Sequence, residues 1–88
     1  LNHFTRSLAL EWAPAVRVNA VMPAVIDTPI HDDRGMSRED LEGMGAIHPM
    51  QRIGQPQEIS SMILYLLSDE ASWMTGAVIP VDGGMTAA

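Results

Sequence analysis

The feature of this chain that most constrains its fold is a pair of short apolar runs, each followed by residues that end a strand. Residues 16–22 contain three valines that alternate with Arg17 and Asn19, and Pro23 follows them. Residues 77–81 form the second run, and Asp82-Gly83-Gly84 comes next. Short runs rich in β-branched residues favour strands, and proline ends a ladder because it has no N–H to donate. The chain is therefore predicted to contain two strands, one near each end.

A helix is predicted between the two runs, beginning at Pro56. Proline is favoured at the first helical position, and the carboxylate of Glu58 lies near the positive end of the helix dipole. Apolar side chains then share one face of this helix: Ile59, Met62, Ile63, Leu66 and Leu67. A strand, a helix and a second strand predict a right-handed parallel crossover of an α/β sheet. Two strands alone seldom form a stable sheet, so we expect the remaining strands to come from outside this sequence.

A second helix is predicted over residues 1–12, where apolar side chains recur at helical spacing. The stripe consists of Leu1, Phe4, Leu8 and Trp12. Ala13-Pro14 ends the helix. The stripe is expected to face a core, and the opposite side, with Ala9 and Leu10, could bury a second face against a partner helix.

The segment between the first strand and the late helix has a different composition, rich in Asp, Gly, Pro and Met. Ser37 with Asp40 three residues later predicts the N-terminus of a short helix near residues 37–44. A long, glycine-punctuated insertion between ordered elements is more often a lid or binding loop than a linker. We expect a lid at about residues 30–53.

Composition excludes several classes of function. With 88 residues, 47% of them hydrophobic, the chain is too short to bury all of its apolar surface alone. The net charge of −6 argues against nucleic-acid and anionic-membrane surfaces, which require clustered Lys and Arg. The absence of cysteine excludes a disulfide framework, and no apolar run approaches the ~20 residues of a membrane span. These features predict a cytoplasmic protein.

The loop at residues 23–29 is the main candidate site. Ligands of open α/β sheets bind at the carboxyl ends of the strands, where this loop begins. It offers the backbone N–H groups of Val25 and Ile26 and the hydroxyl of Thr28, which are the groups that a carboxamide needs. The alternative is a simple turn, because Asp27, Thr28 and Pro29 are all turn-forming residues.

The order and spacing of these motifs resemble the C-terminal part of the classical-type short-chain dehydrogenases/reductases, from Leu1 to about Thr86. The resemblance rests on residues 16–29, on the stretch from His48 to Pro56 and on residues 75–84. It implies that residues 1–88 are the C-terminal portion of one doubly wound, Rossmann-like parallel sheet, with two strands, flanking helices and a substrate lid. It also implies NAD or NADP as the cofactor and a small-molecule alcohol or ketone as the substrate.

Carried over residue by residue, the resemblance implies that Pro23, Ile26 and Thr28 hold the nicotinamide. Ala24 departs from the family pattern, which has glycine at this position. If the position requires a positive φ, alanine there costs roughly 1 kcal/mol.

The catalytic pair of that family, Tyr-x-x-x-Lys, is missing here. The chain contains no lysine, and Asp69 stands four positions after its one tyrosine, Tyr65. No catalytic residue is therefore assigned, and the spacing of the three histidines predicts no metal site. We expect the complete protein to be an NAD(P)-dependent enzyme whose upstream half carries the pair, and we expect the 88-residue chain alone to be inactive.

Two other interpretations stay open. The chain could be a truncated or processed fragment that acts as a non-catalytic assembly module, or an unrelated α/β binding module. In the enzyme interpretation the apolar helices and the last strand imply a homo-oligomer, as a dimer or tetramer. No nucleic-acid or membrane partner is predicted.

Overall fold

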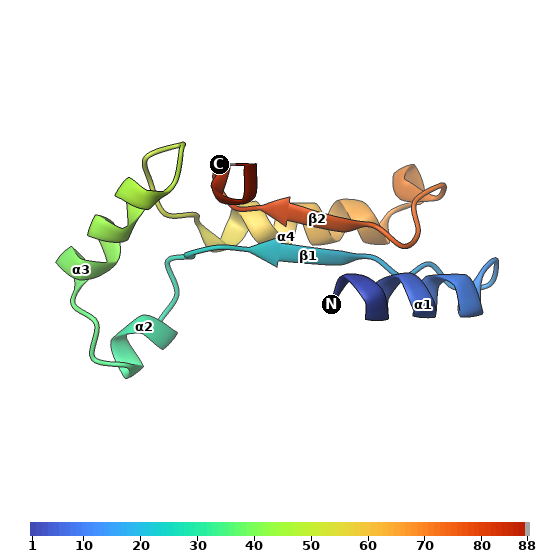
Figure 1. Cartoon of the computed structure of the whole chain (residues 1–88), viewed down its shortest axis with the longest axis horizontal. Coiled ribbons are helices and arrows are strands. Elements are labelled where there is room, and N and C mark those ends of the chain that lie inside the picture. The colour runs from blue at the N-terminus through green and yellow to red at the C-terminus, as the bar shows by residue number, and fades with distance from the viewer. Residues whose placement is uncertain (88) are drawn as a thin grey trace.

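The chain folds into a two-stranded parallel sheet flanked by helices, with a helical segment that projects from one end (Figure 1). The computed structural model describes residues 1–87, apart from the side chain at position 32. The elements follow one another in this order: α1 (Asn2–Trp12), β1 (Ala20–Pro23), α2 (Ile30–Asp33), α3 (Arg38–Gly43), η1 (Met44–Ile47), α4 (Pro56–Leu67), η2 (Asp69–Ala71), β2 (Val78–Val81) and η3 (Met85–Ala87).

Strands β1 and β2 pair in parallel, so the predicted crossover through α4 is confirmed. The register joins Ala20 to Val78 and Pro23 to Val81, and α4 lies behind both strands (Figure 1). β1 begins four residues later than the predicted start at residue 16. Side chains explain the delay, because Val18 N donates to Thr75 Oγ1 at 3.0 Å and Asn19 bonds both to Met74 O and to Ala77 N. These side-chain contacts interrupt the regular ladder before Ala20, where one backbone bond, from Gly76 N to Val18 O at 2.7 Å, remains.

Helix α1 packs through a different face from the one predicted. Its buried residues are Thr5 and Ala9, whereas Phe4, in the apolar stripe, is 66% exposed. The small side chain of Ala9 permits a close approach, since a Cβ built on Gly76 would lie 3.5 Å from the Cβ of Ala9. The prediction that the stripe faces a core is therefore wrong within this chain.

Helix α4 begins as predicted, at Pro56. Glu58 and Gln55 form a capping box in which the Gln55 N–H donates to Glu58 Oε1 at 2.9 Å. Leu66 is buried, while Leu67 lies beyond the edge of the packed face and is 75% exposed. None of the helices in residues 1–87 combines the length and the apolar composition that a membrane crossing requires.

The chain covers little of its own apolar surface. Its radius of gyration is 15.3 Å, against roughly 12 Å expected for a compact domain of this length. Among the described residues, the buried apolar side chains are only Ala9, Leu41, Ile53, Leu66 and Ala71. The exposed apolar side chains of α1 and α4 therefore form large surfaces that this chain leaves open.

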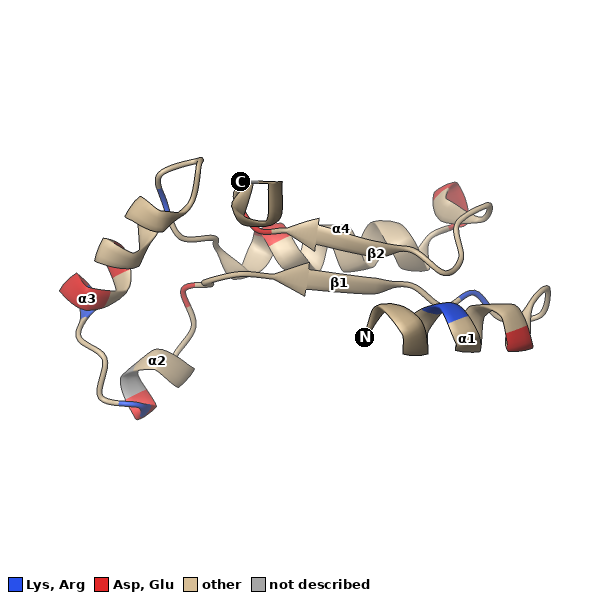
Figure 2. Cartoon of the chain, viewed as in Figure 1, with Lys and Arg blue, Asp and Glu red and all other residues tan. Residues whose placement is uncertain are grey.

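The segment predicted to be a lid, which we call the lid, contains α2, α3 and η1. Ser37 caps α3 as predicted, since its Oγ accepts from Asp40 N at 3.0 Å, and Glu39 and Asp40 lie in the first turn. α2 was not predicted, because its four residues show no apolar period. Acidic residues gather on the lid, whereas both strands are uncharged (Figure 2).

Candidate functional site

The loop at residues 23–29, which we call the clamp loop, leaves the carboxyl end of β1 as predicted. A groove of about 470 Å³ lies between this loop, the start of α2 and one side of α4. Its lining includes Pro23, Ile26 and Thr28. The structure thus brings the three predicted residues to one open groove, next to Ile59 and Ile63 of α4.

The clamp loop presents polar groups that the described residues do not use. The N–H groups of Val25 and Ile26 donate no hydrogen bond to any residue within 1–87, and the hydroxyl of Thr28 has no partner there either. The carbonyl of Thr28, in contrast, accepts from His31 N at 3.3 Å. Two donors and a hydroxyl match a planar carboxamide, which needs donors for its oxygen and an acceptor for its nitrogen.

Ala24 carries no backbone strain. Within residues 1–87 the non-glycine residue with positive φ is Gln51, at 59°. The clamp loop therefore passes through Ala24 in an ordinary conformation, and the anticipated cost of replacing glycine does not arise.

The lid is tied to the clamp loop by two side-chain contacts that were not predicted. His31 Nε2 lies 2.7 Å from Ile26 O and, because a carbonyl only accepts, must carry the proton. Arg38 NH1 contacts Asp27 Oδ1 at 2.6 Å, and this guanidinium lowers the pKa of Asp27. Arg38 and Asp27 are eleven residues apart, so no local pattern could have paired them.

The segment at residues 52–54, which we call the strap, runs beside the clamp loop on its other side. Gly54 N donates to Val25 O, and Asp27 N donates to Gly54 O, both at 2.9 Å. These bonds form an isolated parallel bridge between Ile26 and Gly54. A Cβ on Gly54 would lie 2.6 Å from Ile26 Cδ1, so glycine permits the close approach.

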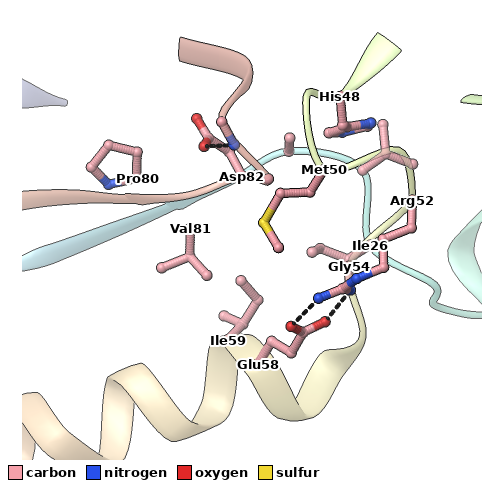
Figure 3. A pocket seen from close by; sticks show the side chains of 14 residues that line it. Ile26, His48, Met50, Arg52, Gly54, Glu58, Ile59, Pro80, Val81 and Asp82 are labelled. Carbon is pink, nitrogen blue, oxygen red and sulfur yellow. Dashed lines mark hydrogen bonds and ion pairs between the residues drawn. The ribbon is translucent and has the colours of Figure 1, made fainter. Parts of the chain in front are cut away.

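A second cavity, of about 290 Å³, lies between the clamp loop, the end of the lid and the turn after β2 (Figure 3). The side chain of Met50 extends across it toward Val81 and Ile59. His48 is 2% exposed; its Nδ1 donates to Met44 O at 3.0 Å, and its Nε2 has no partner within residues 1–87.

The turn after β2 receives the end of the lid. Met50 N donates to Gly83 O at 3.0 Å, and a Cβ on Gly84 would lie 3.1 Å from the ring of Pro49. Gly83 and Gly84 both have positive φ, 62° and 91°, which glycine adopts without strain. Asp82 closes the turn: the Thr86 hydroxyl, followed by nearby backbone N–H groups, lowers the pKa of its carboxyl.

Known proteins are similar to this chain over nearly its whole length. The model of a family described as Enoyl-(Acyl carrier protein) reductase matches residues 1–86. Galactitol 2-dehydrogenase of Rhizobium johnstonii is 47% identical over 87 residues, a match that covers 98% of this chain and 34% of that enzyme. The chain thus spans about a third of the length of the curated relatives it matches.

Solved structures share the architecture. Aldohexose dehydrogenase from Thermoplasma acidophilum, in ligand-free form, matches with a TM-score of 0.86 at 42% identity, covering 99% of this chain and 38% of that one. A 4-hydroxyisoleucine dehydrogenase mutant complexed with NADH and succinate matches with a TM-score of 0.85 at 35% identity, covering 99% of this chain and 36% of that one.

Proposed function

The chain belongs to the short-chain dehydrogenase/reductase family, and from that membership we propose that it is the C-terminal part of an NAD(P)-dependent oxidoreductase acting on an alcohol or ketone. The predicted family and the predicted Rossmann-like α/β class are both confirmed. Its relatives include dehydrogenases and reductases, such as sorbose reductase of Schizosaccharomyces pombe. The observation that carries the proposal is the clamp loop, whose unused N–H groups and hydroxyl lie at the carboxyl end of β1.

In this proposal the clamp loop holds the nicotinamide carboxamide. The N–H groups of Val25 and Ile26 donate to its oxygen, and the hydroxyl of Thr28 contacts its nitrogen. Pro23 ends the strand ladder and turns the chain toward the groove. When bound, the dinucleotide supplies or accepts the hydride, and the clamp sets the ring face that is presented to the substrate.

The general acid/base is proposed to lie in the upstream half of the complete protein. Reduction of a ketone requires a proton donor within hydrogen-bond reach of the oxygen. Tyr65 does not suit this role, because it lies on α4, outside the residues that line the clamp groove, and the chain contains no lysine that could act with it. The 88-residue chain alone is therefore proposed to be inactive.

The remaining roles concern the substrate and assembly. The lid at about residues 30–53 is proposed to cover the substrate, since it is tied directly to the clamp loop by His31 and Arg38. Exposed Phe4 and Trp12, together with the open edge of β2, are proposed to be covered by the upstream half and by a second copy. A monomeric mass of the complete protein in light scattering would contradict the homo-oligomer.

The test is a pair of substitutions at Thr28 in the complete protein. Thr28→Val removes one hydrogen bond, worth about 1 kcal/mol, and should raise the dissociation constant of the dinucleotide about fivefold in calorimetry. Thr28→Ser keeps the hydroxyl and is the matched control, with an unchanged constant expected. Equal binding by wild type and Thr28→Val would remove this residue from the site.

A further inference from the structure

The strap connects the lid to the clamp loop through two close backbone approaches. On one side, a Cβ on Gly45 would lie 2.9 Å from the Cα of Arg52. On the other, Gly54 bridges the clamp loop through its N–H and its carbonyl. Ile53, between these contacts, is buried. The position of the strap therefore determines where Val25 and Asp27 lie.

One ion pair holds the strap in place. Arg52 donates from NH1 to Glu58 Oε1 at 2.7 Å and from NH2 to Glu58 Oε2 at 2.8 Å (Figure 3). A planar guanidinium that bonds to both carboxylate oxygens fixes the relative orientation of the two side chains as well as the distance between them. Arg52 NH1 also lies 3.2 Å from Ile53 O, so the same group orients the peptide that leads into Gly54.

Glu58 is itself held by the first turn of α4. Its Oε1 accepts from the backbone N–H of Gln55 at 2.9 Å, which forms one half of the capping box. Because α4 packs on β1, the position of the Glu58 carboxylate is fixed relative to the sheet from which the clamp loop emerges. The chain of contacts runs from the sheet through α4, Glu58 and Arg52 to Gly54, and from Gly54 back to the clamp loop.

We propose that Arg52 and Glu58 are positioning residues for dinucleotide binding, which act by holding Gly54 against the clamp loop. The inference rests on the proposed function, since it assigns to this pair the alignment of the N–H groups of Val25 and Ile26. Neither side chain lines the clamp groove, although both line the second cavity on the other side of the clamp loop. Their contact with the clamp loop runs through the hydrogen bonds of Gly54 to Val25 and Asp27.

The experiment compares variants of the complete protein by calorimetry with NADH and NADPH and by steady-state kinetics. Arg52→Gln should raise the dissociation constant of the dinucleotide roughly threefold to fivefold, the range expected for one well-formed, partly exposed pair. Arg52→Lys keeps the charge but loses the two-point contact, so its dissociation constant for the dinucleotide should lie between those of Arg52→Gln and the wild type. The KM of the alcohol or ketone should not change.

The matched control is Glu42→Gln, which removes the exposed Arg38–Glu42 pair on the lid and leaves the strap intact. It should bind the dinucleotide as the wild type does. A merely structural role for Arg52 would lower the melting temperature and the active fraction without altering the dissociation constant of the folded protein. If Arg52→Gln does not fold, Arg52→Lys decides by the same measurement.

The outcomes separate this inference from the proposed function. If the wild type binds a dinucleotide and Thr28→Val weakens binding, but the folded Arg52 variants bind like the wild type, the positioning role is overturned and the clamp stands. If the complete wild-type protein binds neither dinucleotide, the proposed function fails and this inference fails with it.

Discussion

Gly45 offers a sharp test of how tightly the lid packs against the strap. It is buried in η1, and a Cβ added there would lie 2.9 Å from Arg52 Cα, 3.2 Å from Arg52 C and 3.3 Å from Ile53 N. Favourable carbon–carbon contacts begin near 3.5 Å, so about 0.6 Å of separation must be created. All three neighbours are backbone atoms, so no side chain can rotate away, and Gly45→Ala must displace the strap itself.

The expected cost follows from this geometry. Overpacking of a close contact costs about 1–3 kcal/mol, and replacing glycine recovers about 0.4–1 kcal/mol through the unfolded state. Because the neighbours are backbone atoms, the overpacking cost lies in the upper part of its range, and the net destabilisation of the complete protein should be about 1–2 kcal/mol. For a domain of 150–250 residues, each 1 kcal/mol lowers the melting temperature by about 2–4 °C, so a decrease of roughly 2–8 °C is expected in calorimetric melting.

Gly43→Ala is the matched control, two residues away. Gly43 has a φ of −60°, and a Cβ there would meet nothing within 4 Å. This variant should melt at or slightly above the wild-type temperature. If Gly45→Ala and Gly43→Ala melt alike, the close packing of η1 on the strap is refuted.

Three further predictions concern stability. Arg52 and the Gln55 N–H lower the pKa of Glu58 from 4.5 to about 2, so the stabilising contribution of Glu58 is complete above pH 4.5 and lost as the pH falls toward 2. The stability of Glu58→Gln, measured against pH, should lack this loss. An identical pH dependence in the wild type and the variant would contradict the prediction. Asn19→Ala leaves the Ala77 N–H unpaired and leaves Met74 O with Arg17 as its donor, at a cost of about 1–3 kcal/mol in thermal unfolding, whereas Asn19→Asp should lose less because it keeps the acceptor for Ala77 N. Ser37→Ala removes the cap of α3, worth about 1 kcal/mol, and should raise amide exchange across residues 38–43 but not in α4.

The beginnings of two helices could be predicted because capping is local. Ser37 and Asp40 are three residues apart, as are Gln55 and Glu58, and in each pair a side chain bonds to a backbone N–H of the same turn. Such contacts need only the neighbouring residues, so the pattern is visible in the sequence. Proline after a β-branched run likewise predicted the end of β1.

The packed face of α1 could not be predicted in the same way. Periodicity identified the stripe through Phe4, yet the buried side chains are Thr5 and Ala9. A helix buries the face that its neighbours approach. Here the loop before β2 lies so close to α1 that only small side chains fit between them. The stripe is left for surfaces that other parts of the complete protein provide.

For this protein, the residue pattern alone predicted the α/β crossover and the family, which are confirmed, and the position of a loop after the first strand, because each depends on short-range periodicity or on motif spacing. Three contacts could be found only in the folded chain: that of Arg38 with Asp27, the two-point bond of Arg52 to Glu58, and the packing of Gly45 against the strap. These contacts join different elements, and their geometry depends on the path of the backbone between them. Charge and residue type determine which groups such a side chain can bind, but the packing of the elements determines which of those groups lies close enough to be its partner.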